Sequence, residues 1–439
     1  MIDKLPSLAT VLCLILIQSK VGVPPAAAQQ KPPPLSNEQL LTEIQRRACL
    51  YFWECADPKT GLTNDRAKNR VKDDNTAASV SSTGYALAAL PIAVEHKWVT
   101  RKEALKRAEI TLRFLVYKSP QVHGWFYHWP DRRTGLRGWN CEVSTIDTAL
   151  LVAGALMCGQ YFHGTEVERL ANSLYDRLDW DWVRTNGGAK PNKLTVSHGW
   201  KPETGFLPYE WDRYCELKTL YILGLGARKP LRAESWTVWE RTVVEYKGRK
   251  TLGGGPIFFH EMAYGYWDFR DQRDKLGWDY WVSALNGIQI NRQYCIDNIP
   301  MRRTYFEDIW GLNANDAPDG YRAYSAPGSE DGTVSPTGAV ASIMCYPDLA
   351  TRAANTIYSK YADRLWGRYG FGNAFNVDRN WYDPDVIGID LGMVLLAIEN
   401  HRTGLPWKLM AALPATQRAW KRIGFRRTKE SLPRPIFLP

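Results

Sequence analysis

The chain has 439 residues, of which 45% are hydrophobic and 12% aromatic, and it carries a formal net charge of +10. Single hydrophobic cores stop growing at roughly 250–300 residues, so a chain of this length forms either two domains or one ring-shaped repeat. No nucleic-acid-binding motif accompanies the positive charge. We therefore expect a solvated basic surface and no nucleic-acid partner.

The N-terminus has the features of a secretory signal peptide. Lys4 precedes an apolar run over residues 8–17, and Ala26-Ala27-Ala28 offers a small-residue cleavage site. We predict a signal peptide over 1–28, a Pro-rich linker over 29–35 and a secreted or periplasmic protein. No other run of about 20 apolar residues follows, so we expect no transmembrane segment in the mature chain.

After the linker, amphipathic helices alternate with small-residue or apolar helices. Capping boxes at Ser36–Gln39 and Thr100–Glu103 mark two helix starts. The alternation occurs six times, and a long aromatic loop of roughly 12–35 residues lies within each pair. The predicted helices cover residues 36–54, 82–96, 100–118, 144–162, 165–182, 209–223, 234–245, 257–267, 279–298, a stretch from 335, 347–361, and a stretch around Asp390.

Six amphipathic outer helices and six apolar inner helices fit an all-α (α/α)6 toroid over residues 36–425, followed by a basic tail over 426–439. Sustained alternation of β-branched residues, the sign of strands, is weak. If the inner helices run parallel, the long aromatic-rich loops gather on one face. The repeats share no sequence similarity, so this prediction rests on spacing.

Three of the apolar helices begin with a single acidic residue: Asp147, Glu216 and Asp390. A lone carboxylate beside an apolar helix is costly unless it is paired, protonated or used. On parallel inner helices these carboxylates converge. Two of them have a structural alternative: Asp147 could serve as a cap, and Glu216 could form a buried ion pair with Arg213 or Lys218.

The loops combine aromatic rings, which stack on sugars, with polar groups that bind hydroxyls. Glycoside hydrolysis needs two carboxyl groups, one a protonated acid and the other a base or nucleophile. We therefore interpret Glu216, Asp390 and Asp147 as candidate catalytic residues, without metal or cofactor. The candidate substrate-binding residues are Glu142, Trp139, Trp200, Glu210, Trp211, His260, Glu261, Trp310, Asp319, Tyr321 and Trp381.

Some of these candidates have plainer interpretations. Glu210 could be a surface residue at a helix start, and His260 or Glu261 could be a satisfied polar group in the core. The tryptophans and tyrosines could serve packing alone. Their concentration in loops favours sugar binding instead.

Several longer motifs resemble a known family. They include His198-Gly199-Trp200, the stretch from Trp211 to Glu216, Trp310-Gly311-Leu312-Asn313-Ala314 and Gly388-Ile389-Asp390-Leu391-Gly392. Over about residues 40–412 the chain is similar to the bacterial glucoamylase-like family and looks like glycoside hydrolase family 144.

That family comprises (α/α)6 β-1,2-glucanases that act with inversion. The resemblance implies that Glu216 is the general acid and that Asp390 and Asp147 are important acids of the site. The chain departs from the family pattern at Ser144 and Asn140, where acidic residues are common. The departure leaves the substrate and the identity of the base open.

We thus expect hydrolysis of a β-glucan, with β-1,2 linkages favoured, in which Glu216 protonates the leaving oxygen. Asp390, or Asp147 through a water or substrate hydroxyl, would act from the opposite side. Inversion predicts a carboxyl separation of roughly 6.5–9.5 Å, against about 5–5.5 Å for retention. We expect a monomer that binds an oligo- or polysaccharide.

Three alternatives remain open on the sequence. The first is an α-glucan hydrolase of the glucoamylase kind, and the second is a non-catalytic envelope protein that binds glycans. The third is a lyase or epimerase on the same toroid. That last reaction would use histidines, of which the loops offer His123, His128, His198 and His260.

Overall fold

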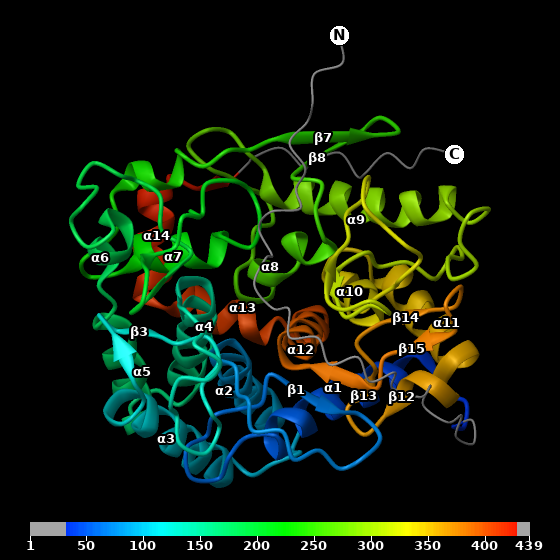
Figure 1. Ribbon diagram of the computed structural model, residues 1–439, viewed down its shortest axis with the longest axis horizontal. Helices are drawn as coiled ribbons and strands as arrows, with labels where there is room; N and C mark the ends of the chain where they lie inside the picture. Colours follow the sequence, from blue (N-terminus) through cyan, green and yellow to red (C-terminus); the bar gives the residue numbers. More distant parts are fainter. Residues whose placement is uncertain (1–31, 428–439) are drawn as a thin grey trace.

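The computed structural model describes residues 32–427 (Figure 1). The predicted signal peptide, linker residues 29–31 and tail residues 428–439 lie outside the described part. Arg426 and Arg427, which we assigned to the tail, form strand β17 (Arg426–Arg427), which pairs with β9 (Gln272–Arg273).

The fold is an all-α (α/α)6 toroid, as predicted. Figure 1 shows inner helix α12 viewed end-on near the middle of the molecule. The inner helices are α2 (Val80–Glu95), α4 (Thr145–Tyr161), α7 (Lys218–Gly226), α8 (Met262–Tyr266), α10 (Pro336–Ala341) and α12 (Gly388–Arg402). The outer helices are α1 (Asn37–Glu54), α3 (Arg101–Tyr117), α5 (Glu166–Asp176), α9 (Tyr280–Asp297) and α11 (Pro347–Leu365). Further helices are α6 (Trp180–Thr185), α13 (Leu405–Ala412) and α14 (Pro414–Ile423), with 3-10 turns η2 (Ala233–Trp236), η3 (Ile257–His260) and η4 (Ser342–Met344).

Burial explains the two kinds of helix. The inner helix α4 is buried on almost every side, whereas the outer helix α5 buries one apolar stripe. Helices α2 and α4 approach each other closely at Gly84 and Gly154. A Cβ at Gly154 would lie only 1.9 Å from the Gly84 carbonyl oxygen, so the contact requires glycine at position 154. Both predicted capping boxes are present, at Ser36 and Thr100.

The predicted outer helix over 234–245 is wrong. The segment forms η2 and then a hairpin of β7 (Val243–Tyr246) and β8 (Arg249–Leu252). Lys247 and Gly248 have φ of 47° and 76°, as the tight turn of a hairpin requires. The β-branched Val243 and Val244 favour the strand. The C-terminal helix α14 packs against α7 and covers that side of the ring.

Three further helix predictions were too long. The predicted helix over 209–223 begins only at Lys218, because the N–H groups of Trp211 and Tyr214 donate to the carbonyls of Val196 and Glu240. The stretch 257–267 divides into η3 and α8. Similarly, 165–182 divides between α5 and α6.

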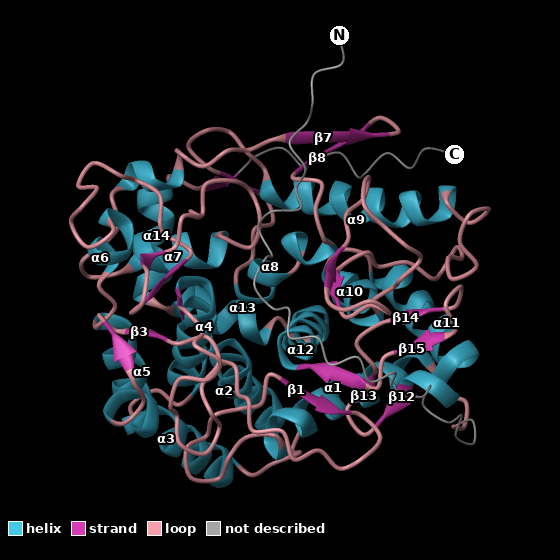
Figure 2. Ribbon diagram, in the orientation of Figure 1, coloured by secondary structure: helices cyan, strands magenta, loops and turns pink. Residues whose placement is uncertain are grey.

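The strands are short and lie in the segments that connect the helices, with β7 at the upper edge of the view in Figure 2. Two sheets matter for the site. Pairing of β1 (Arg66–Lys68) with β16 (Asp385–Ile387) leads directly into α12, and pairing of β4 (Val143–Ser144) with β5 (Gly199–Lys201) leads into α4. The other strands are β2 (Gln121–Val122), β3 (Trp125–Phe126), β6 (Gly205–Phe206), β10 (Ala314–Asn315), β11 (Arg322–Ala323), β12 (Trp366–Gly367), β13 (Gly370–Phe371), β14 (Phe375–Asn376) and β15 (Trp381–Tyr382). Between residues 32 and 427, no helix has the length and apolar character to cross a membrane.

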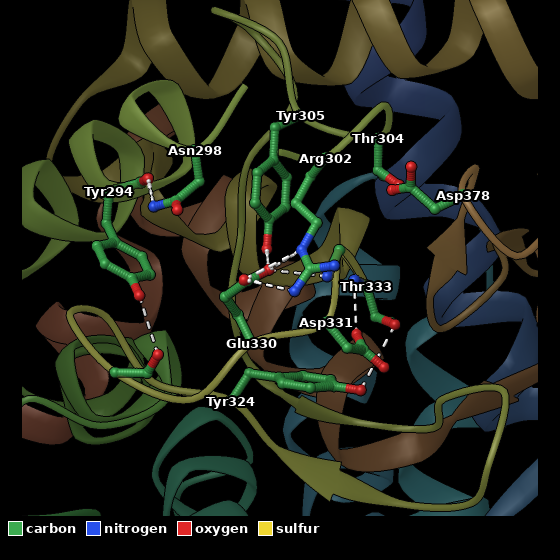
Figure 3. A network of polar contacts seen from close by, with 12 residues as sticks. Tyr294, Asn298, Arg302, Thr304, Tyr305, Tyr324, Glu330, Asp331, Thr333 and Asp378 are labelled. Atoms are coloured by element: carbon green, nitrogen blue, oxygen red, sulfur yellow. Dashed lines mark hydrogen bonds and ion pairs between the residues drawn. The ribbon is translucent and has the colours of Figure 1, made fainter. Parts of the chain in front are cut away.

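A polar network fastens the longest loop, residues 300–335 (Figure 3). Glu330 accepts hydrogen bonds from Arg302 Nη2 at 2.9 Å and from the Tyr305 hydroxyl at 2.6 Å. Both ends of the loop are thereby joined. The middle of the loop carries Tyr321, so the network contributes to the position of a candidate site residue.

Glu330→Gln should destabilise the protein by about 1–2 kcal/mol, because the partly exposed Arg302 loses its charged partner and Tyr305 loses a charged acceptor. The free energy of unfolding in denaturant measures this loss. The matched control is Glu307→Gln, an exposed position of the same loop, which should change stability by no more than about 0.5 kcal/mol. Equal effects of the two substitutions would show that the network does not fasten the loop.

Candidate active site

Three acidic side chains lie where inner helices begin. Asp147 and Asp390 are each the third residue of their helices, α4 and α12, and Glu216 lies in the turn before α7. The charge of Asp147 acts on Glu216, and both Asp147 and Asp390 act on the hydroxyl of Tyr85 from α2. Four inner helices therefore bring these groups together at one end of the ring.

His128 holds Asp147 in place. Its Nε2 lies 3.3 Å from Asp147 Oδ2, and its Nδ1 lies 2.8 Å from Glu142 Oε1. The imidazole stacks on Trp129 with ring centroids 3.5 Å apart. Although burial alone would lower the pKa of His128, the charges of Asp147 and Glu142 raise it to about 9. His128 is therefore a cation between two carboxylates at neutral pH.

Asp147 also takes part in the helix cap. The Ser144 hydroxyl donates to Asp147 Oδ2 at 2.6 Å and accepts from the Asp147 N–H at 3.3 Å. The capping alternative is thus present together with the His128 pair. Burial opposes ionisation of Glu142, but its bond to His128 lowers the pKa of Glu142 below the ordinary value.

His128→Gln should reduce thermal stability in a pH-dependent way. The folded pKa of about 9 lies above the ordinary value of 6.5, so the stabilisation is complete below pH about 6.5 and is lost as the pH rises through about 9. The difference in unfolding free energy between parent and variant should be up to about 3 kcal/mol at acidic pH. Thermal unfolding at three pH values tests this.

His163→Gln, which removes an exposed histidine paired with Glu168, should show no such trend. A difference that persists unchanged above pH 9 would contradict the charge-pair explanation.

Glu216 is partly exposed and has a raised pKa. Burial is the main cause of the rise, and the nearby charge of Asp147 adds to it. The two cationic partners that sequence suggested are engaged elsewhere. Arg213 pairs with Asp212 at 3.3 Å, and Lys218 donates to the carbonyls of Cys215 and Phe259. Glu216 therefore forms no ion pair with either cation, although the charge of Lys218 opposes the rise in the pKa of Glu216.

Asp390 is 4% exposed, and its Oδ2 accepts a hydrogen bond from Asn373 Nδ2 at 2.5 Å. Burial raises the pKa of Asp390 to about 7 despite this bond, and the carboxylates of Asp316 and Asp65 add to the rise. Its ionisation therefore falls within the range in which a general base works near neutral pH.

Glu261 is a second buried acid beside Asp390. Its Oε1 accepts from the Ser342 hydroxyl at 2.8 Å, and its Oε2 has no hydrogen-bond partner within the described chain. Burial raises the pKa of Glu261 well above its ordinary value, and the charge of Asp390 contributes. Glu261 is 1% exposed, so it can influence Asp390 but does not offer an open contact to a sugar.

Three other candidate sugar contacts prove to be core residues. Trp310 has no exposed surface, and His260 is buried beside the Tyr214 hydroxyl at 3.3 Å. Trp211 stacks on His198 at 3.8 Å and donates to the Thr145 hydroxyl at the start of α4. The structure therefore corrects these assignments, because the three side chains position other residues and have little or no surface for a ligand.

The remaining candidates keep accessible surface. Trp139 is 67% exposed and Tyr321 is 45% exposed. The charge of Asp390 helps to raise the pKa of Tyr321, so its hydroxyl end lies near that acid. Trp200 and Trp381 are half-buried. Asp319 is exposed and forms an ion pair with Arg379. Glu210 forms an ion pair with Lys193 at 3.2 Å.

One group of acids could hold a cation. Among residues 32–427, the carboxylates of Asp316, Asp383 and Asp385 lie within 4.8 Å of one another. Arg66 pairs with Asp316 at 2.7 Å and Lys68 pairs with Asp385 at 2.7 Å, so their charge is already partly balanced. Our expectation of a mechanism without metal or cofactor stays a prediction.

Two residues that contact the acids, His128 and Asn373, were not among the predicted site residues. His128 was considered only for a lyase or epimerase, and Asn373 was not considered at all. The S/T-x-x-D pattern that begins at Ser144 is a local signal for the contact between Ser144 and Asp147. No local signal links His128 to Asp147 or Asn373 to Asp390, because those contacts form only in the folded ring.

Comparison with known proteins gives the family. A family model described as "Putative glucoamylase" matches residues 208–414. The crystal structure of a Bacteroides uniformis protein described in the same words is 30% identical, with a TM-score of 0.83 and coverage of 90% of this chain and 99% of that one. This chain belongs to the glucoamylase-like family.

Several relatives carry functional names, including the two that follow. An endo-β-1,2-glucanase from Chitinophaga pinensis, solved with sophorotriose and glucose, is 27% identical over 90% of this chain and 99% of its own, with a TM-score of 0.82. An exo β-1,2-glucooligosaccharide sophorohydrolase from Parabacteroides distasonis is 28% identical over 89% of this chain. The chain spans only 58% of the length of that curated relative.

Proposed function

We propose that this protein is a glycoside hydrolase that cleaves β-1,2-linked glucan with inversion by general acid/base catalysis. One observation carries the proposal: Glu216, Asp147 and Asp390 lie where inner helices begin. The surroundings of the three carboxyl groups differ. Acid and base roles require carboxyl groups whose pKa values are set apart by their surroundings.

Glu216 fits the general acid. Burial raises its pKa, which is the direction that a proton donor requires, and its partial exposure allows it to reach a leaving oxygen. Asp390 fits the general base, because a pKa of about 7 gives a substantial ionised fraction at neutral pH. Asp147 pairs with His128, and its charge contributes to the raised pKa of Glu216.

The relatives support the β-1,2 linkage. The two functionally named relatives described above act on β-1,2-linked glucose chains, and each resembles nearly the whole described ring. Tyr321 is exposed and its hydroxyl lies near Asp390, so it offers aromatic surface for a flanking sugar. Trp139 is exposed beside Trp129, the ring that stacks on His128, and offers a second such surface. The family description, by contrast, favours α-glucan as the second candidate substrate.

The test is hydrolysis by the purified full chain of linear β-1,2-, β-1,3- and α-1,4-glucans, with the anomer of the new reducing end followed by NMR. Cleavage of β-1,2-glucan with release of the α-anomer would support the proposal. Cleavage of α-1,4-glucan would favour the second candidate. An unsaturated product would identify a lyase, and binding without turnover would identify a glycan-binding protein.

A further inference from the structure

Asn373 joins the loop over 300–335 to strand β16 and to the helix α12 that follows it. Its side chain is 1% exposed, and Nδ2 donates to Asp390 Oδ2 at 2.5 Å. Its Oδ1 accepts from the backbone N–H of Asp316 at 3.0 Å, and its own N–H donates to the Asp385 carbonyl at 2.8 Å. The loop over 300–335, strand β16 and inner helix α12 therefore meet at one residue, whose side-chain amide links the loop to the helix.

These partners allow only one orientation of the amide. A backbone N–H can only donate, so the side-chain oxygen of Asn373 must face Asp316 and its NH₂ group must face Asp390. A flipped amide would bring two donors together at Asp316 and an oxygen against the carboxylate of Asp390. Oδ2 of Asp390 is consequently held as an acceptor.

The charges around Asp390 do not hold it in the ionised form by themselves. Burial favours the protonated form, and Asp316 and Asp65 act in the same direction, whereas Asn373 is the strongest influence in favour of the carboxylate and Arg66 adds to it. The other titratable groups that face Asp390 are Tyr85 from α2, Glu261 before α8 and Tyr321 from the long loop.

We propose that Asn373 is a positioning residue, which fixes Asp390 Oδ2 as a hydrogen-bond acceptor and leaves Oδ1 to take the proton of the attacking water. The inference rests on the proposed hydrolase function. It adds that the loop over 300–335 is coupled to the base, because the same amide is oriented by Asp316 from that loop.

Asn373→Ala tests the proposal, with Asn376→Ala as the matched control. Asn376 lies three residues further along, at the end of strand β14, and it is fully buried. It donates to the Asp331 carbonyl and the Thr333 hydroxyl, both at 3.1 Å. In the pH profile of kcat/KM on β-1,2-glucooligosaccharides, Asn373→Ala should move the acidic limb upward by about one pH unit. Activity should fall about tenfold on the acidic side and largely recover on the alkaline side.

The control separates positioning from folding. Asn376→Ala should lower thermal stability without moving the acidic limb. An unchanged limb in Asn373→Ala, or an equal shift in both variants, would overturn the proposal.

A second readout does not depend on turnover. The stability gained on Asp390→Asn, measured by thermal unfolding across pH, should have its midpoint at higher pH in the Asn373→Ala background than in the parent. An inactive parent would overturn the hydrolase function alone, whereas an unchanged midpoint would overturn the role of Asn373 alone.

Discussion

Glu216→Gln should lower kcat on β-1,2-glucan by about 10³-fold, within the range that general acid catalysis contributes. The amide cannot donate a proton to the leaving oxygen, but it keeps the shape of the side chain, so the dissociation constant for oligosaccharide should change little. Steady-state kinetics gives the first quantity and titration calorimetry the second. Loss of binding together with turnover would contradict the assigned role.

The leaving group provides a sharper test of the same role. A nitrophenyl glycoside with a good leaving group needs little protonation, so Glu216→Gln should retain far more activity on it than on glucan. The matched control is Glu234→Gln, an exposed acid on η2, which should behave like the parent on both substrates. Equal losses on the two substrates would exclude Glu216 as the acid.

Asp390→Asn should abolish hydrolysis and yet stabilise the protein at alkaline pH. The folded pKa of about 7 lies above the ordinary value of 3.8, so the folded state binds the proton more tightly and stability falls as the pH rises from about 4 to about 7. Above pH about 7, removing this charge should recover up to roughly 4 kcal/mol. Below pH about 4 the substitution should have little effect.

Thermal unfolding at about pH 5 and pH 8 measures this, with a gain of several degrees expected at pH 8 and a clearly smaller gain at pH 5. The control is Asp274→Asn, also buried, whose carboxylate accepts from Trp236 Nε1 at 2.8 Å and from the Tyr280 hydroxyl at 2.7 Å. That variant should lose stability at both pH values. A loss at pH 8 for Asp390→Asn would show that the buried carboxylate stabilises the fold, which contradicts a pKa raised by desolvation.

Local signals explain which parts of the fold could be predicted. Capping boxes and 3.6-residue periodicity act within a few residues, so the helices that begin after Ser36 and Thr100 were correct. The hairpin at Lys247-Gly248 was missed, because Lys-Gly is a weaker turn signal than Asn-Gly and the short strand looked amphipathic. The helix before Lys218 was overextended because distant segments, at Val196 and Glu240, take up its N–H groups.

The sequence by itself determined the ring of helices and the acids at their starts, because periodicity and capping are properties of neighbouring residues. It did not determine which aromatic side chains remain exposed. Trp310 and Trp139 both lie in polar loops, yet one is fully buried and the other is 67% exposed.

Only the tertiary structure decided the electrostatic character of the acids. Contacts of Asp147 with His128 and of Asp390 with Asn373 join residues that lie 17 or more positions apart in the chain. Desolvation and charge depend on everything that surrounds a group in space. The same carboxyl group can therefore be an acid, a base or a cap, according to which neighbours the folded ring places beside it.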